Sequence, residues 1–147
     1  MSPEFKRPQA AAQEVQMTTI RREIQIDASP QSVWDAVRDV GALHTRLVPG
    51  FVVDTRMDGD ARIVTFGNGM VAREEIVSVD EPTRRVAWAI VGQQFRHYNA
   101  AAQVFENDHG GTRFLWTTDL LPNELASHVS TMMEAGIAVI KKTMEKG

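Results

Sequence analysis

The chain has 147 residues, and its 16 Lys and Arg against 19 Asp and Glu give a formal net charge of −3. This length suits one domain with one core, and the mild acidity argues against a nucleic-acid partner, which needs a clustered positive field. The chain contains no cysteine, which excludes disulfides, thiolate catalysis and cysteine-bound metals. No apolar run approaches the roughly 18–20 residues of a membrane span, and no signal-peptide pattern is present. We therefore expect a cytoplasmic protein without membrane insertion.

Residues 1–16 differ in character from the rest of the chain. Residues 1–8 resemble a translated cloning linker, and residues 9–16 are rich in Ala and Gln without strong periodicity. Met17 fits a natural start. We expect residues 1–16 to be a leader or cloning-derived tail and residues 17–147 to form the folded domain.

The first elements of the domain are predicted to be one strand and two short helices. From Thr18 to Ile26 apolar residues alternate with charged and polar ones, which is typical of a half-buried strand. Ser29 is placed to cap a helix whose first position is Pro30, where a missing N–H costs nothing. A second short helix is predicted over 40–47, before a Pro-Gly pair.

Six strand signals follow, each ended by turn residues such as Asp-Gly-Asp at 58–60 and Asn-Asp-His-Gly-Gly at 107–111. The predicted strands cover 51–56, 61–66, 70–79, 85–91, 97–105 and 112–119. Intervals this short suit antiparallel neighbours better than helical crossovers. The sequence therefore predicts one antiparallel sheet.

A long amphipathic helix is predicted at the end of the chain, capped by Asn123 and running to about Met144. Its apolar stripe follows helical spacing and comprises Leu125, Val129, Met132, Met133, Gly136, Ile137, Ile140 and Met144. Lys141 and Lys142 lie at the end that the helix dipole favours for cations. Because the stripe needs a partner surface, we expect it to lie on the concave face of the sheet.

This order of elements, together with three local signatures, resembles the START-like helix-grip superfamily (SRPBCC). The signatures are IDASPQSVWD at 26–35, EEIVSVD at 74–80 followed by RVAW at 85–88, and GTRFLW at 111–116. The resemblance covers 17–146 and is nearest to the bacterial polyketide cyclase/dehydratase-type group. It implies an α+β fold in which a seven-stranded antiparallel sheet wraps around the long C-terminal helix, with two short helices after the first strand. It also implies that 17–147 is a ligand-binding domain whose partner is a small hydrophobic molecule held in an internal cavity.

Strand parity supplies candidates for the lining of that cavity. The superfamily pattern puts Glu74 inside, and neighbouring strands then direct large aromatic and small residues inward. Large aromatics beside small side chains can leave room for a ligand. The candidate ligand-binding residues are Arg62, Val64, Phe66, Met70, Ile76, Trp88, Ala100, Trp116, Thr118, Met132, Met133 and Gly136. The alternative is that these side chains form an ordinary core without a void.

Three polar residues are candidates for catalysis. A carboxylate that faces an apolar interior needs a partner, and Arg62, or Arg73 in a different register, could pair with Glu74. Glu74 would then bind a polar end of the ligand or act as a general base. His97 and Tyr98 begin a strand and could shuttle a proton and polarise a carbonyl oxygen. The alternative for Glu74 is a salt bridge with structural value only.

Other chemistry finds no support in the sequence. His44 is expected in the short second helix, where it either overhangs the cavity mouth or is solvated, and His109 is expected on the surface. The four histidines contain no pair at metal-ligand spacing, so we predict no metal. Dinucleotide, phosphate-loop and serine-hydrolase motifs are missing, so we predict no cofactor. Binding of a small hydrophobic molecule is preferred, with polyketide cyclase/dehydratase chemistry as the alternative, and whether the protein is a monomer or a homodimer stays open.

Overall fold

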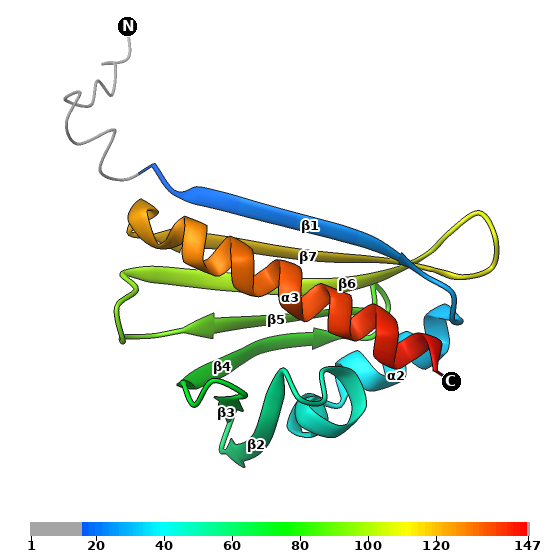
Figure 1. The fold of residues 1–147 in the computed structure, drawn as a ribbon, viewed down its shortest axis with the longest axis horizontal. Coiled ribbons are helices and arrows are strands. Elements are labelled where there is room, and N and C mark those ends of the chain that lie inside the picture. The colour runs from blue at the N-terminus through cyan, green and yellow to red at the C-terminus, as the bar shows by residue number, and fades with distance from the viewer. Residues whose placement is uncertain (1–15, 147) are drawn as a thin grey trace, which may run out of the picture.

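Seven antiparallel strands form one sheet in the order β1-β7-β6-β5-β4-β3-β2 in a computed structural model that describes residues 16–146 (Figure 1). The strands are β1 (Thr18–Ile26), β2 (Val52–Asp58), β3 (Ala61–Phe66), β4 (Val71–Asp80), β5 (Arg85–Ile90), β6 (His97–Glu106) and β7 (Thr112–Leu121). Each of β2 to β7 pairs with its chain neighbour, whereas β1 pairs with β7 at the far edge. The expected helix-grip sheet is confirmed.

The long helix α3 (Ala126–Glu145) crosses one face of this sheet, which we call the inner face (Figure 1). Its buried residues are Val129, Met133, Gly136, Ile137 and Ile140, all members of the predicted apolar stripe. Its most extensive contacts are with β1, followed by a helical segment at Leu43–Leu47 and then β7. The helix therefore sits on one side of the inner face and leaves the β3–β5 side less covered.

Two short helical segments follow β1. The helix α2 (Pro30–Arg38) begins as expected, because the Ser29 side chain accepts a hydrogen bond from the Ser32 N–H at 3.1 Å. The predicted second helix is divided into a 3₁₀ turn, η1 (Val40–Ala42), and a π-helix, η2 (Leu43–Leu47). Both lie beside β2, so this segment closes one end of the space under α3.

The predicted cap of the long helix is wrong. A 3₁₀ turn, η3 (Asn123–Leu125), precedes α3, and no side chain caps either element. The Asn123 side chain instead accepts a hydrogen bond from the Thr18 hydroxyl at 2.7 Å and donates one to the Gln16 carbonyl at 3.0 Å. It ties the start of β1 to the end of β7, and the helix begins three residues later.

The predicted inward parity of the strands is confirmed for β5, β6 and β7. The buried inward residues are Val86, Trp88 and Ile90 on β5, Tyr98, Ala100, Ala102 and Val104 on β6, and Phe114, Trp116 and Thr118 on β7. The expectation that residues 1–16 form a tail lies outside the described residues, apart from Gln16. Among residues 16–146, no helix is both long enough and apolar enough to span a bilayer.

One buried hydroxyl gives a test of this architecture. Thr112 is fully buried at the start of β7, and its hydroxyl donates to the Ala28 carbonyl at 2.9 Å, which fixes the entry to α2. Thr112→Val keeps the shape but removes the donor, so the free energy of unfolding should fall by about 1–2 kcal/mol in urea titration. Thr117→Val, on the outer face of the same strand, should change it by less than about 0.5 kcal/mol. Equal effects of the two changes would contradict the role of this hydroxyl.

Candidate functional site

Two adjoining hollows lie between α3 and the inner face. The outer cleft has a volume of about 460 Å³, and the inner hollow about 60 Å³. Both are lined by Phe51, Phe66, Glu74, Tyr98 and Met132, so these residues mark where the two spaces meet. The outer volume falls within the range of about 300–1,000 Å³ that is usual for small-molecule sites.

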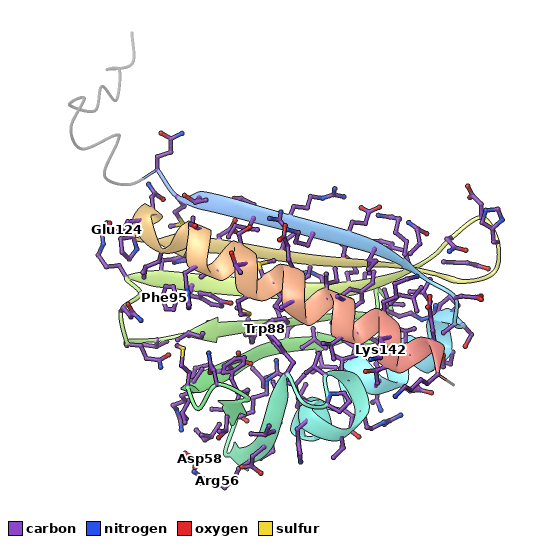
Figure 2. All side chains as sticks on the ribbon, viewed as in Figure 1. Arg56, Asp58, Trp88, Phe95, Glu124 and Lys142 are labelled. Carbon is purple, nitrogen blue, oxygen red and sulfur yellow. The ribbon has the colours of Figure 1, made fainter. Side chains whose placement is uncertain are left out.

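The outer cleft lies between the first half of α3 and the loops that precede β4 and β6. The Gln93 side-chain amide donates to the Val71 carbonyl at 2.9 Å, which joins the loop before β6 to the start of β4. Behind this contact the Phe95 ring packs on Tyr98 with 4.8 Å between ring centroids. Figure 2 shows Phe95 at the end of the molecule where α3 begins. The mouth of the cleft is therefore built from loops, and its floor from the sheet.

The inner hollow is enclosed by aromatic rings and by the π-helix η2, which contributes Leu43 and Leu47. Trp88, which Figure 2 shows where α3 crosses the sheet, lies 6.3 Å from the Trp116 ring between centroids. Ala102 lies on β6, between the strands that carry Trp88 and Trp116, and its small side chain leaves space that the rings do not fill. Three side-chain polar atoms in this region are buried without a hydrogen-bond partner: Trp88 Nε1, Trp116 Nε1 and Thr118 Oγ1.

A buried ion pair lies where the two hollows meet. Arg62 on β3 faces Glu74 on β4, and Arg62 Nε donates to Glu74 Oε1 at 2.8 Å. Their side chains are only 4% and 8% exposed. Arg62 also donates to the Val40 carbonyl at 3.3 Å and lies 5.2 Å from the centre of the Trp88 ring. Of the two partners considered from the sequence, Arg62 is the correct one, because Arg73 pairs with exposed carboxylates on the outer face.

Tyr98 is the second polar residue that lines both hollows, and it is 4% exposed. Burial raises the pKa of its hydroxyl well above the usual value, and the charge of the nearby Glu74 raises it further. The Thr118 hydroxyl lies beside it and lowers the pKa, but without reaching hydrogen-bond geometry. The phenol therefore keeps its proton at neutral pH and offers a donor to a molecule in the hollows.

The structure brings together eight of the fifteen residues predicted for the site. Those that line one or both hollows are Arg62, Phe66, Met70, Glu74, Trp88, Tyr98, Trp116 and Met132. Met70 is 45% exposed and belongs to the mouth. These residues come from β3, β4, β5, β6, β7, the loop before β4 and α3, which are far apart in the sequence but share the inner face.

Six predicted lining residues do not reach either hollow. Val64 and Met133 are packed with no exposed surface. Ile76, Ala100 and Thr118 lie in one cross-strand row with Trp88. Of the residues in this row, Trp88 lines a hollow and the other three do not. Gly136 was expected to widen the cavity, and this expectation is wrong. A Cβ atom there would lie 3.0 Å from Trp116 and 3.1 Å from Phe51, so the glycine allows close packing of α3 instead.

His97 and His44 do not lie at the predicted site. His97 has the opposite strand parity to Tyr98 and lines neither hollow, so the structure does not bring it to Glu74. His44 is half-buried in η2 and does not overhang the cleft, whereas His109 lies in an exposed turn as expected. Within residues 16–146, no three His, Asp or Glu side chains come close enough to hold a metal ion.

Several lining residues escaped the sequence analysis. Phe51, Leu43 and Leu47 come from the segment between η1 and β2, and Phe95 from the loop before β6. His128 on α3 also lines the outer cleft. Helical spacing could have identified His128, because it lies three residues after Leu125 and four before Met132. The loop residues carry no periodic signal.

The ion pair can be tested by a double-mutant cycle. Arg62→Leu leaves the Glu74 carboxylate buried without its partner, so the free energy of unfolding should fall by about 3–5 kcal/mol in urea titration. Adding Glu74→Leu to this variant should recover part of the loss, because the unpaired charge is removed. Arg73→Leu, at an exposed pair, should leave the stability nearly unchanged. Strictly additive losses from the two changes would contradict a buried, coupled pair.

Comparisons with known proteins agree with this geometry. A family model described as "Polyketide cyclase / dehydrase and lipid transport" matches residues 17–146. Among curated proteins, none matches the chain.

Solved structures share the fold at low identity. An uncharacterized protein from Bacillus thuringiensis superimposes with a TM-score of 0.77 at 14% identity, covering 86% of this chain and 98% of that one. The protein XoxI from Bacillus cereus gives 0.76 at 16% identity, with coverage of 87% and 96%. A truncated norcoclaurine synthase from Thalictrum flavum gives 0.68 at 18% identity, with coverage of 88% and 92%. From the family match and this shared fold, the chain belongs to the polyketide cyclase/dehydrase and lipid transport family of the START-like helix-grip superfamily.

Proposed function

We propose that this domain binds a small, mainly apolar molecule in the outer cleft, with one end of the molecule directed at the inner hollow. The observation that carries the proposal is a cleft of about 460 Å³ that meets a single buried ion pair at its floor. The walls of the inner hollow are mainly aromatic and aliphatic, and the outer cleft combines such walls with polar side chains that include Asn68, Gln93 and His128. This combination is typical of small-molecule sites, where apolar walls supply affinity and a few polar atoms fix orientation.

The forces expected in this site follow from its lining. Removing apolar ligand surface from water contributes roughly 25 cal/mol per Å². Met70 and Met132 are flexible and can adapt to the ligand's shape, whereas Phe66 and Trp116 are rigid walls. Glu74 would orient the polar end. We therefore propose that the ligand contacts the residues that line the hollows, which include Tyr98 and the Arg62–Glu74 pair.

A cavity-filling variant tests binding. Ala72 is a buried residue of β4 that lines the outer cleft, and Ala72→Leu would occupy part of the cleft. The neutral fluorescent probe N-phenylnaphthylamine should bind the unaltered protein and raise its melting temperature. The variant should bind the probe about tenfold more weakly, a loss of about 1.4 kcal/mol. Ala138→Leu, on the exposed face of α3, is the matched control, and equal probe affinity in both variants would refute binding in the cleft.

Acid–base chemistry is a second candidate function. The observation that favours it is that a carboxylate and a protonated phenol, Glu74 and Tyr98, line the same two hollows. In an aldol closure, Glu74 would take a proton from the carbon next to a carbonyl, and Tyr98 would donate a hydrogen bond to the enolate oxygen. The family description names cyclases and dehydrases, and one structural neighbour is a synthase by name, which supports chemistry in a cavity of this kind.

Turnover assays separate catalysis from binding. With a polyketide-like polyketone as substrate, Glu74→Gln and Tyr98→Phe should each lower kcat by about a hundredfold or more, since each removes a group that acts on the reacting atoms. His97→Ala should leave the rate unchanged, because that side chain lies outside both hollows. Unchanged rates in the first two variants would leave binding as the function.

The expected cytoplasmic location stays a prediction, which cell fractionation can test.

A further inference from the structure

We infer that the ligand is a neutral molecule whose apolar body carries a hydroxyl group, and that this hydroxyl donates a hydrogen bond to Glu74. The inference rests on the proposed binding function and specifies the chemical class of its ligand. It follows from the charge, the unused hydrogen-bonding capacity and the position of the polar side chains where the hollows meet.

The charges of the lining residues favour a neutral ligand. Among the residues that line the two hollows, the Asp, Glu, Lys and Arg side chains are Arg62 and Glu74, and these pair with each other at 2.8 Å. Their formal charges cancel. A carboxylate or ammonium group on the ligand, placed beside this pair, would therefore leave one charge without compensation in a mostly apolar space. Burying an uncompensated charge costs several kcal/mol, so a neutral ligand is favoured.

The Glu74 carboxylate has hydrogen-bond acceptor positions that the protein does not use. A carboxylate accepts about four hydrogen bonds. Glu74 receives one from Arg62 through Oε1, and the other described residues donate none to it. Because Glu74 lines both hollows, its remaining acceptor positions face the space that a ligand would fill. A ligand that only accepts, such as an ether, would place its oxygen against this carboxylate without forming a bond, whereas a hydroxyl would donate to it.

Tyr98 is placed to bind the same ligand group as Glu74. It lines both hollows with Glu74, and its hydroxyl, which lies beside the Thr118 hydroxyl without bonding to it, is available to a ligand. Glu74 pairs with Ile90 on β5, and Tyr98 lies on the next strand, on the same inner face. A ligand hydroxyl between the two can therefore donate to the carboxylate and accept from the protonated phenol. A hydroxyl group fits both partners at once, because it is both donor and acceptor.

A matched ligand series on the full chain tests this inference at pH 7 by calorimetry. Naphthol donates, methoxynaphthalene has nearly the same shape but cannot donate, and naphthoate carries a negative charge. Naphthol should bind about tenfold more tightly than methoxynaphthalene, since a hydrogen bond to a charged acceptor is the difference between them. Naphthoate should bind most weakly. Equal binding of naphthol and methoxynaphthalene, or tightest binding of naphthoate, would overturn the inference while leaving the binding function intact. Absence of binding by all three, with the neutral probe also unbound, would overturn the binding function and the inference with it.

A variant locates the preference at Glu74. Glu74→Gln should bring the affinity ratio of naphthol to methoxynaphthalene close to one. Because this variant leaves Arg62 unpaired and can unfold, the double variant Arg62→Gln/Glu74→Gln, which carries no buried charge, is measured beside it. Glu75→Gln, at the neighbouring position that pairs with Arg73 on the outer face, should keep the full preference. An unchanged ratio in a folded variant that lacks the Glu74 carboxylate would refute the assignment.

Discussion

The site depends on the position of the long helix, which packs on one side of the inner face of the sheet. α3 packs at close range on β1 and β7, and Gly136 lets the helix approach Trp116 on β7 and Phe51 before β2. Close packing on that side means that the inner face of the strands beyond it is covered by loops and by η2 rather than by the helix. The hollows extend from beneath α3 into this more open half of the inner face, and Gly136 borders the inner hollow because Trp116 and Phe51, which it contacts, both line it.

Inside that open half, one ion pair fixes the chemistry of the space. Arg62 and Glu74 are adjacent across β3 and β4, so the sheet register itself holds their side chains together. The guanidinium is further held by the Val40 carbonyl and by the Trp88 ring. An isolated charge would not survive burial here, but a neutral pair can, and it leaves a carboxylate oriented towards the hollows. The pair therefore stabilises the cleft floor and supplies a polar group that can bind a ligand.

The antiparallel strands and the inward parity of β5 to β7 could be predicted from alternation and turn residues, which are local signals, whereas the arrangement of the sheet and the inward position of Glu74 are implied by the family resemblance. The Asn123 cap could not, since its side chain is taken by residues at the start of β1. The role of Gly136 could not be predicted either. A glycine can leave an empty space or let a neighbouring side chain pack closely, and which of the two occurs here depends on the distance to Trp116. The loop residues Phe51 and Phe95 lack any period and reach the site only through the tertiary fold.

The distribution of unsatisfied polar atoms adds a last argument for function at this face. Buried polar atoms without partners cost about 1–3 kcal/mol each, and native cores contain few of them. In the described part of the chain, three of the six such side-chain atoms belong to Trp88, Trp116 and Thr118, and Trp88 packs against Arg62 of the buried ion pair. A sequence selected for stability alone would place apolar atoms there. Departures from polar satisfaction concentrate at functional sites, and Trp88 and Trp116, which hold two of these atoms, line the inner hollow.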